Sequence, residues 1–385
     1  MSNAIGRTFS KQNMRKRKIR VLFVSPLTSS VVGGIVKWTK NILDYYRQVK
    51  LNSDVELLPC YNDGIINELN GSRILGRVRN GIVNYLPLIR KVRHELDQSK
   101  VDVVHICSSA SVGLIKDLVL MHLAKNNGAK TVVHFHFGRM PVLFNKCNWE
   151  QRLIKKVISS ADTVVVMDMA SYNTLAKYGY KHVCYIPNPL SLDTRICIEK
   201  YKDRIKRIAG KVVFVGQMLA TKGIFELAEA INRIEGVKVY FIGPIPNADV
   251  TARLHTLLSA DKLVLCGSMS FEKVIQEMLS ASVFVLPTYT EGFPNVIIES
   301  MACACPIVTT PVGAIPEMLN IRDEKYKCGI CVPVKDVRNL ENAIREMLDN
   351  RAQAMKMGQM ACERVNGEYS IQRVWSLLQD TWLTS

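Results

Sequence analysis

The chain has 385 residues, a length that predicts two domains, because single hydrophobic cores rarely grow beyond roughly 250–300 residues. Its hydrophobic fraction of 48% excludes a disordered chain, and every apolar run is well short of the ~18 residues that a membrane-spanning helix needs. The net charge of +17 is uneven: residues 1–190 contain 28 Lys and Arg against 12 Asp and Glu, whereas residues 191–385 contain 23 against 22. The first half should therefore meet something anionic: nucleic acid, an acidic membrane leaflet or a phosphorylated acceptor.

The eleven cysteines are odd in number and scattered through a long chain. This distribution does not resemble a disulfide framework and places the protein in a reducing cytoplasm. Cys303, Cys305, Cys328 and Cys331 could be combined into a zinc site, but their separation and apolar flanks favour four small buried residues. No metal site is therefore predicted.

The first half of the chain alternates strands with helices after a tail. Residues 1–17 are polar and basic, which predicts a basic mobile tail. Strands are predicted at 21–24, 55–58, 101–106, 131–135 and 163–166, with helices at 35–49, up to about 96, and at 112–125. This alternation is typical of a doubly wound, mostly parallel sheet, in which ligands bind at the carboxyl ends of the strands.

Three polar features follow strands of this first sheet. Gly33 and Gly34 open a helix and would let the backbone approach a phosphate or an acceptor. His134 and His136 alternate along one face of a strand, so that either could be a structural residue that points inside. Arg139 follows them and could pair with an acceptor phosphate.

The second half repeats the alternation. Strands are predicted at 211–215, 237–242, 262–265 and 283–286, and the last three helices at 337–348, 352–365 and 371–381. A second doubly wound domain follows from this pattern.

The most informative stretch follows the strand predicted at 283–286. A helix is predicted to start near Asn295, with Glu291 in the loop before it and Glu299 roughly 6 Å further along the helix axis. The free N–H groups and the positive dipole end of a helix start attract phosphate. Because helical side chains lean toward the N-terminus, Glu299 would accept hydrogen bonds from a ribose just beyond that phosphate. Glu291 and the backbone at Gly292 would face a sugar at the other end of a diphosphate.

This stretch, Glu-Gly-Phe-Pro-Asn-Val-Ile-Ile-Glu, resembles the E-x7-E signature of retaining GT-B glycosyltransferases, and most of all their family-four group. The resemblance extends from about residue 20 to the end and is strongest in the second half. It implies an α/β fold of two Rossmann-like doubly wound domains that face each other across a cleft. The acceptor-side domain would span 18–188, the nucleotide-sugar domain 189–369, and the C-terminal helix within 370–385 would cross back onto the first.

The resemblance also assigns roles by position. It implies that Lys222 and Gln217 bind the diphosphate; at the position of Gln217 the family usually has Arg. It gives Glu299 the ribose, Glu291 the sugar, and His136 a sugar hydroxyl near the reaction; His136, Glu291 and Lys222 are the candidate catalytic residues. Backbone contacts with the donor are implied at Gly33, Gly34, Gly267, Gly292, Phe293, Asn295 and Val296.

Three further segments match the family, and no catalytic or binding role is assigned to them. Ser171 and Asn173 are predicted to cap the helix after strand 163–166. The run Tyr-Ile-Pro-Asn-Pro-Leu at 185–190 corresponds to the linker between the domains, and Gly-Ala-Ile-Pro-Glu at 313–317 matches a segment after the E-x7-E stretch.

The sequence therefore predicts a hexosyltransferase that moves a sugar, with retention, from a nucleotide-diphosphate-sugar to a glycan or lipid-linked acceptor in cell-surface polysaccharide synthesis. It contains no Asp-x-Asp pair, so we expect protein groups rather than a metal to balance the diphosphate, with no cofactor beside the donor substrate. A donor phosphate oxygen would take the acceptor proton, as the family implies. We expect the protein in the cytoplasm, with the inner face of the membrane as a possible place of work.

Two alternatives remain open: a nucleotide-sugar epimerase of the same architecture, and a non-catalytic basic protein that binds a membrane surface. The basic stretches lack interleaved aromatic residues, which argues against nucleic acid and leaves an anionic membrane surface as the better partner. Donor sugar, base, acceptor and linkage leave no readable pattern in the sequence.

Overall fold

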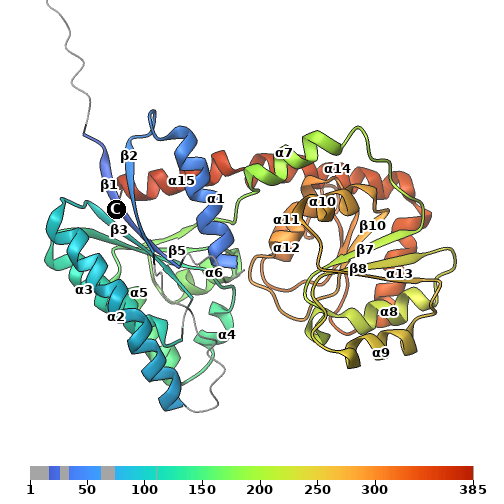
Figure 1. The fold of residues 1–385 in the computed structure, drawn as a ribbon, viewed down its shortest axis with the longest axis horizontal. Coiled ribbons are helices and arrows are strands. Elements are labelled where there is room, and N and C mark those ends of the chain that lie inside the picture. Colours follow the sequence, from blue (N-terminus) through green and yellow to red (C-terminus); the bar gives the residue numbers. More distant parts are fainter. Residues whose placement is uncertain (1–16, 27–33, 62–73, 110, 385) are drawn as a thin grey trace, which may run out of the picture.

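The computed structural model describes residues 17–26, 34–61, 74–109 and 111–384, with residues 74–84 as backbone alone. Two six-stranded sheets lie side by side along the long axis of the molecule, each flanked by helices (Figure 1). Most of the predicted tail, residues 1–16, lies outside the described residues, as does Gly33.

The first sheet has the strand order β2-β1-β3-β4-β5-β6, with parallel pairing throughout. Its strands are β1 (Ile19–Ser25), β2 (Val55–Tyr61), β3 (Val103–Ser108), β4 (Lys130–Phe135), β5 (Thr163–Val166) and β6 (Val183–Tyr185). Its helices are α1 (Gly34–Val49), α2 (Ile74–Gln98), α3 (Gly113–Asn126), α4 (Met140–Phe144), α5 (Trp149–Ser160) and α6 (Met169–Lys177). The central strands β3 and β4 are buried along almost their whole length, because helices cover both faces of the sheet.

The second sheet has the order β12-β11-β10-β7-β8-β9 and is also parallel. Its strands are β7 (Lys211–Val215), β8 (Lys238–Ile242), β9 (Leu263–Gly267), β10 (Val283–Leu286), β11 (Ile307–Thr309) and β12 (Ile330–Cys331). The helices of this half are α7 (Leu192–Tyr201), η1 (Ala220–Lys222), α8 (Ile224–Asn232), α9 (Ala248–Leu257), α10 (Phe271–Ser280), α11 (Asn295–Ala302), α12 (Ile315–Met318), α13 (Val337–Asp349), α14 (Arg351–Glu368) and the last, α15 (Ile371–Thr384). The predicted α/β fold with two doubly wound units is confirmed.

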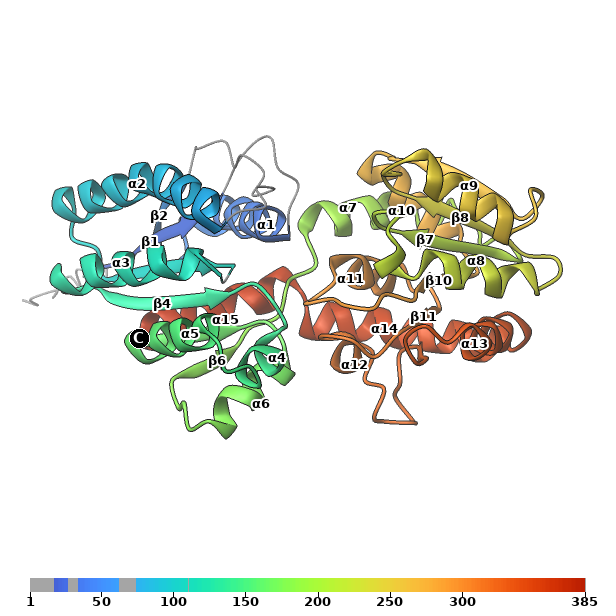
Figure 2. The same cartoon turned by 90° about the horizontal axis from the view of Figure 1, so that it is seen from below.

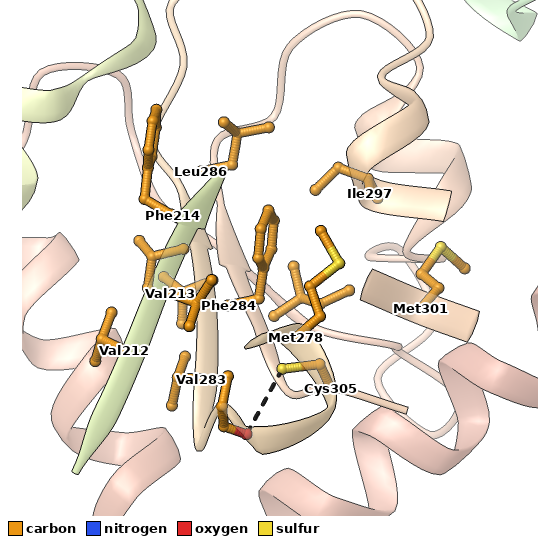
Figure 3. Close-up of a cluster of buried hydrophobic side chains, with 14 of the residues drawn as sticks. Val212, Val213, Phe214, Met278, Val283, Phe284, Leu286, Ile297, Met301 and Cys305 are labelled. Carbon is orange, nitrogen blue, oxygen red and sulfur yellow. Dashed lines mark hydrogen bonds between the residues drawn. The ribbon is translucent and has the colours of Figure 1, made fainter. Parts of the chain in front are cut away.

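The helix α11 is held in place by an apolar core. Its Ile297 and Met301 are fully buried against β10, where Phe284 contributes the largest side chain, and Met278 of α10 packs beside them (Figure 3). A helix fixed by this many buried contacts presents its N-terminus at one position, which is what a binding site requires.

The C-terminal helix α15 belongs to the core of the first sheet. Its Trp382 is 1% exposed, lies beside Phe23 of β1, and donates a hydrogen bond from Nε1 to Nδ1 of His105 on β3 at 3.0 Å. The two chain segments that connect the sheets run next to each other, with the N–H of Leu190 donating to the carbonyl of Tyr369 at 2.7 Å. The last helix therefore ties the end of the chain to its beginning.

Three histidines are stacked inside the first domain beside this helix. The rings of His134 and His136 are 4.1 Å apart, His105 lies 5.5 Å from His134, and Trp38 packs against all three. Burial lowers the pKa of His105 and of His136 to about 3, and the pKa of His134 well below its ordinary value. The stack is therefore neutral at neutral pH, as an apolar core demands.

The stack makes the first domain sensitive to acid. Because the folded pKa values lie below the unfolded value near 6.5, the stabilisation is complete above pH 6.5 and is lost as the pH falls toward 3. We expect the free energy of unfolding to fall by about 1.4 kcal/mol per pH unit for each histidine that titrates only in the unfolded chain. Urea titrations at several pH values between 7 and 4, followed by tryptophan fluorescence, measure this slope.

A matched pair of variants isolates the stack. H134F should make the pH dependence shallower by one proton, whereas H122F, at an exposed position of α3, should leave it unchanged. Equal slopes for H134F and the unmodified chain would contradict the assignment.

Candidate active site

The strand order of the second sheet reverses between β10 and β7, and the loops that follow these two strands meet at that point. Gly223, after η1, has φ of +73°, and a side chain there would collide with the carbonyl of Pro287. Only glycine allows this approach. As a result Lys222 reaches the loop after β10, where its Nζ forms an ion pair with Oε1 of Glu291.

The loop before α11 is also held by a glycine contact. Gly313, with φ of +57°, lies against the carbonyls of Glu291 and Gly292, and the N–H of Ala314 donates to the carbonyl of Gly292 at 2.9 Å. Pro294 is in an extended conformation, and the helix starts at Asn295. The N–H groups of the first turn are thereby aimed at one place.

Glu299 lies one turn inside α11 and is only 7% exposed. Its Oε1 pairs with Nζ of Lys37, which belongs to α1 of the first domain, and the same ammonium lies 5.3 Å from the ring centre of Phe271 at the start of α10. Lys37 thus joins the two domains at the residue for which the sequence predicts ribose binding. No motif in the sequence marks Lys37; its position three residues after Gly34, on the same helix start, is the one signal that points to it.

A cavity of about 280 Å³ lies between the domains in front of the α11 start. Its lining comes from both halves: Gly34, Ile35, His136, Phe137, Gly138, Arg139, Met167, Asn188, Thr290, Glu291, Gly292, Phe293 and Asn295. Of the predicted residues, Gly34, His136, Glu291, Gly292, Phe293 and Asn295 are among them.

The domains touch at the edge of this cavity. A methyl group on Gly138 would lie 3.0 Å from Cα of Gly292, so the two glycines let the loop after β4 meet the loop before α11. Asn188, in the connection between the domains, is 4% exposed and donates from Nδ2 to the carbonyl of Phe293 at 3.2 Å and to Oδ1 of Asn295 at 3.3 Å. The connection therefore braces the start of α11, a role that the linker motif did not reveal.

The predicted histidine and arginine of the first domain both reach the cavity. His136 is partly exposed, its Nε2 has no hydrogen-bond partner among the described residues, and its lowered pKa keeps the ring neutral. A neutral imidazole can donate or accept a hydrogen bond at a sugar hydroxyl. Arg139 pairs with Glu150 of α5 at 3.2 Å, so that its charge is already partly balanced.

Other predicted residues lie apart from the cavity. Gln217 is exposed in the turn after β7 and is not among the lining residues, and Gly267 ends β9 with φ of +65°. Val296 is half-buried in the first turn of α11, and Lys222 borders the cavity through Glu291. Gly33 cannot be placed, because it lies outside the described residues.

A second contact between the domains involves two acids, the half-buried Glu317 and the buried Asp168. Oε2 of Glu317, on α12, accepts a hydrogen bond from the N–H of Met169 at 2.6 Å, and Tyr185 donates to its Oε1 at 3.2 Å. Beside it, Asp168 is fully buried. Burial raises the pKa of Glu317 to about 7, with the Asp168 carboxylate adding to the rise.

The same region corrects a capping prediction. Ser171 and Asn173 were expected to cap the helix after strand 163–166, but α6 begins at Met169 with Asp168 as its N-cap. Oδ1 of Asp168 accepts from the N–H of Ser171 at 2.7 Å. The prediction was wrong because an aspartate that directly follows the strand reaches the free N–H groups first.

Two parallel, doubly wound sheets with a cavity between them define the GT-B architecture. Solved structures share the fold: sucrose-phosphate synthase from Thermosynechococcus elongatus aligns with a TM-score of 0.70 at 16% identity over 95% of this chain and 99% of that one. HepE from Anabaena, solved in complex with UDP-glucose, aligns with a TM-score of 0.66 at 15% identity over 95% of this chain and 100% of its own.

Family models match both halves: "Glycosyltransferase Family 4" at residues 32–194 and "Glycosyl transferases group 1" at residues 209–350. Among curated relatives, the putative teichuronic acid biosynthesis glycosyltransferase TuaC of Bacillus subtilis is 25% identical over 63% of this chain and 66% of its own length. The sulfoquinovosyl transferase SQD2 of Arabidopsis thaliana is 23% identical over 91% of this chain and 71% of its own. The chain belongs to the GT-B glycosyltransferases of the family-four type, which confirms the resemblance found in the sequence.

The Glu317 contact should respond to pH in the opposite direction to the histidine stack. Its folded pKa, about 7, lies above the unfolded value of 4.5, so its stabilisation is complete below pH 4.5 and is lost as the pH rises through 7. E317Q keeps an oxygen for the Met169 N–H and carries no charge. We expect it to raise the free energy of unfolding at pH 8 by at most about 3 kcal/mol and to change little at pH 4.

Thermal unfolding of E317Q at both pH values measures the difference. E324Q, which removes an exposed carboxylate in the loop after α12, is the control and should show no pH-dependent gain. A destabilised E317Q at pH 8 would contradict this account.

Proposed function

We propose that this glycosyltransferase moves a single sugar from a nucleotide-diphosphate-sugar to a hydroxyl of a glycan or lipid-linked acceptor, with retention at the anomeric carbon. The observation that carries the proposal is the α11 start at the wall of the interdomain cavity, with Glu291 on one side and Glu299 on the other, each held by a lysine. A HepE structure holds UDP-glucose in the same fold, which supports a nucleotide-sugar as the donor.

The donor lies across the start of α11. Its diphosphate accepts hydrogen bonds from the N–H groups of Asn295 and Val296 and attracts Lys222, which leaves Glu291 free to accept from the sugar hydroxyls. Its ribose donates to Glu299, in competition with Lys37. Lys222 and the start of α11 thus place positive charge next to the diphosphate. Negative charge develops there as the bond between the sugar and the diphosphate breaks.

The acceptor approaches from the first domain. His136, kept neutral by its stack, hydrogen-bonds a hydroxyl of the transferred sugar, and Gly34 and Gly138 leave room for the acceptor in the cavity. The acceptor hydroxyl attacks the anomeric carbon, and its proton passes to a phosphate oxygen of the departing nucleoside diphosphate. The attacking hydroxyl and the departing diphosphate then lie on the same face of the sugar, which is what retention requires.

Polysaccharide synthesis is the setting that we propose. TuaC is named for teichuronic acid biosynthesis and CapM of Staphylococcus aureus, 26% identical over 57% of this chain and 58% of its own length, for capsular polysaccharide. The eleven cysteines, odd in number and scattered through the chain, fit work in the reducing cytoplasm. An epimerase would convert the donor without an acceptor, so product analysis with and without a glycan acceptor separates the two activities.

Loss of the Lys222–Glu291 pair or of the Lys37–Glu299 pair should abolish transfer without unfolding the protein. We expect K222A to lower kcat by about 100- to 1,000-fold, because it removes one charged donor at the developing diphosphate. E299A should mainly weaken donor binding, seen as a rise in KM and a lost thermal shift with nucleotide-sugar.

The controls are K356A and E363Q, at exposed positions of α14. Both should retain transfer and the thermal shift. Transfer retained by K222A or E299A, with unfolding temperatures like that of the unmodified protein, would refute these roles.

We propose that the reaction needs no divalent metal. Among the described residues no group of three or more His, Cys, Asp and Glu side chains is placed to hold an ion, and the charge at the diphosphate is supplied by Lys222 and the helix start. We therefore expect the rate to be unchanged by EDTA, measured as product formed from labelled donor. A rate that falls with EDTA and returns with Mg²⁺ or Mn²⁺ would overturn this part of the mechanism.

A further inference from the structure

The outer surface of α3 and α5 combines exposed apolar residues with positive charge. Both helices bury their inner sides in the same core of the first sheet and contact each other, so their outer sides point the same way (Figure 2). We call this surface the α3–α5 face. It consists of Ile115, Val119, Lys146, Trp149, Arg152 and Lys156.

The spacing along the helices places these side chains on one stripe each. Ile115 and Val119 are 52% and 38% exposed and lie four residues apart on α3. Trp149, Arg152 and Lys156 follow at i, i+3 and i+7 on α5, opposite the buried Ile154 and Val157. A large aromatic residue on the outer stripe of an amphipathic helix indicates a binding surface.

Trp149 is the most informative of them. The chain has four tryptophans, and Trp38, Trp375 and Trp382 are all at most 4% exposed, whereas Trp149 is 58% exposed. An indole is well suited to the boundary between lipid tails and headgroups, because it combines a large apolar ring with one N–H donor.

The chain segment that contains Trp149 is mainly basic. Residues 139–182 contain seven Lys and Arg but only three acids. None of the three acids is exposed: Glu150 pairs with Arg139, Asp162 with Lys125, and Asp168 is buried. Lysines and arginines around an exposed aromatic match the negative potential of an anionic leaflet.

The face also meets the cavity. Glu150 neighbours Trp149 in the first turn of α5 and forms its ion pair with Arg139, which lines the cavity between the domains. A sugar carried on a lipid could therefore reach the cavity while its anchor stays in the bilayer.

We propose that the α3–α5 face docks on an anionic membrane surface, with Trp149 at the headgroup level, and that this brings a lipid-linked acceptor to the cavity. The statement about the acceptor rests on the proposed glycosyl transfer, whereas docking itself does not. Within the described residues no helix is long and apolar enough to cross a bilayer.

The protein is mixed with two kinds of vesicles, one of phosphatidylcholine alone and one of phosphatidylcholine with phosphatidylglycerol. Sedimentation and tryptophan emission are recorded for each. Binding and a blue shift are expected with phosphatidylglycerol vesicles only, and both should weaken with salt. Because the other three tryptophans are buried, W149F should abolish the blue shift.

Charge-reversal variants test whether vesicle binding depends on the α3–α5 face or only on the net charge of the protein. R152E/K156E should weaken binding by roughly 30-fold or more, since each basic residue near an anionic surface adds a factor of about five. R338E/K356E makes the same change of charge at exposed positions of α13 and α14 and should bind nearly as well as the unmodified protein.

Three outcomes would overturn docking: an unchanged emission on vesicles, an equal loss of binding in both double variants, or equally tight binding of single-stranded RNA through the same residues. The thermal shift with nucleotide-sugar keeps the two proposals apart. R152E/K156E should retain that shift and lose vesicle binding, whereas a protein that binds vesicles but shows no shift with any nucleotide-sugar would leave docking intact and refute the transferase mechanism.

Discussion

The arrangement of the whole molecule depends on charge balance at the start of α11. A helix N-terminus carries positive partial charge, and two glutamates lie beside it: Glu291 lines the cavity between the domains, and Glu299 is buried one turn inside the helix. Carboxylates in such a place need partners, and the fold supplies one lysine from each domain. Lys222 comes from η1 of the same domain and Lys37 from α1 of the other domain, so the Lys37–Glu299 pair links the position of α11 to the placement of the two domains.

Glycine makes these approaches possible. Gly223 and Gly313 adopt left-handed conformations where a side chain would collide with the carbonyls of neighbouring loops, and Gly138 with Gly292 lets the two domains touch. Each of these positions lies after a strand or beside the α11 loop. The backbone around the cavity is therefore fixed by close main-chain contacts.

Two sets of ionisable groups respond to pH in opposite directions. One is the neutral histidine stack, of which His136 lines the cavity, and the other is Glu317, which joins α12 to the start of α6. The stack is stable when deprotonated and Glu317 when protonated. Together the two sets favour a maximum in the free energy of unfolding at weakly acidic to neutral pH.

The sequence alone determined the two doubly wound sheets, because continuous apolar strands and amphipathic helices are local patterns that the chain itself displays. It also determined the α11 turn, since Glu291, Asn295 and Glu299 lie within nine residues and their spacing is fixed by one loop and one helix. Only the tertiary structure decided which residues from distant parts of the chain meet them. Lys37 reaches Glu299 across 262 positions and Asn188 reaches Phe293 across 105, and no local pattern encodes contacts between two domains whose relative placement depends on packing along their whole boundary.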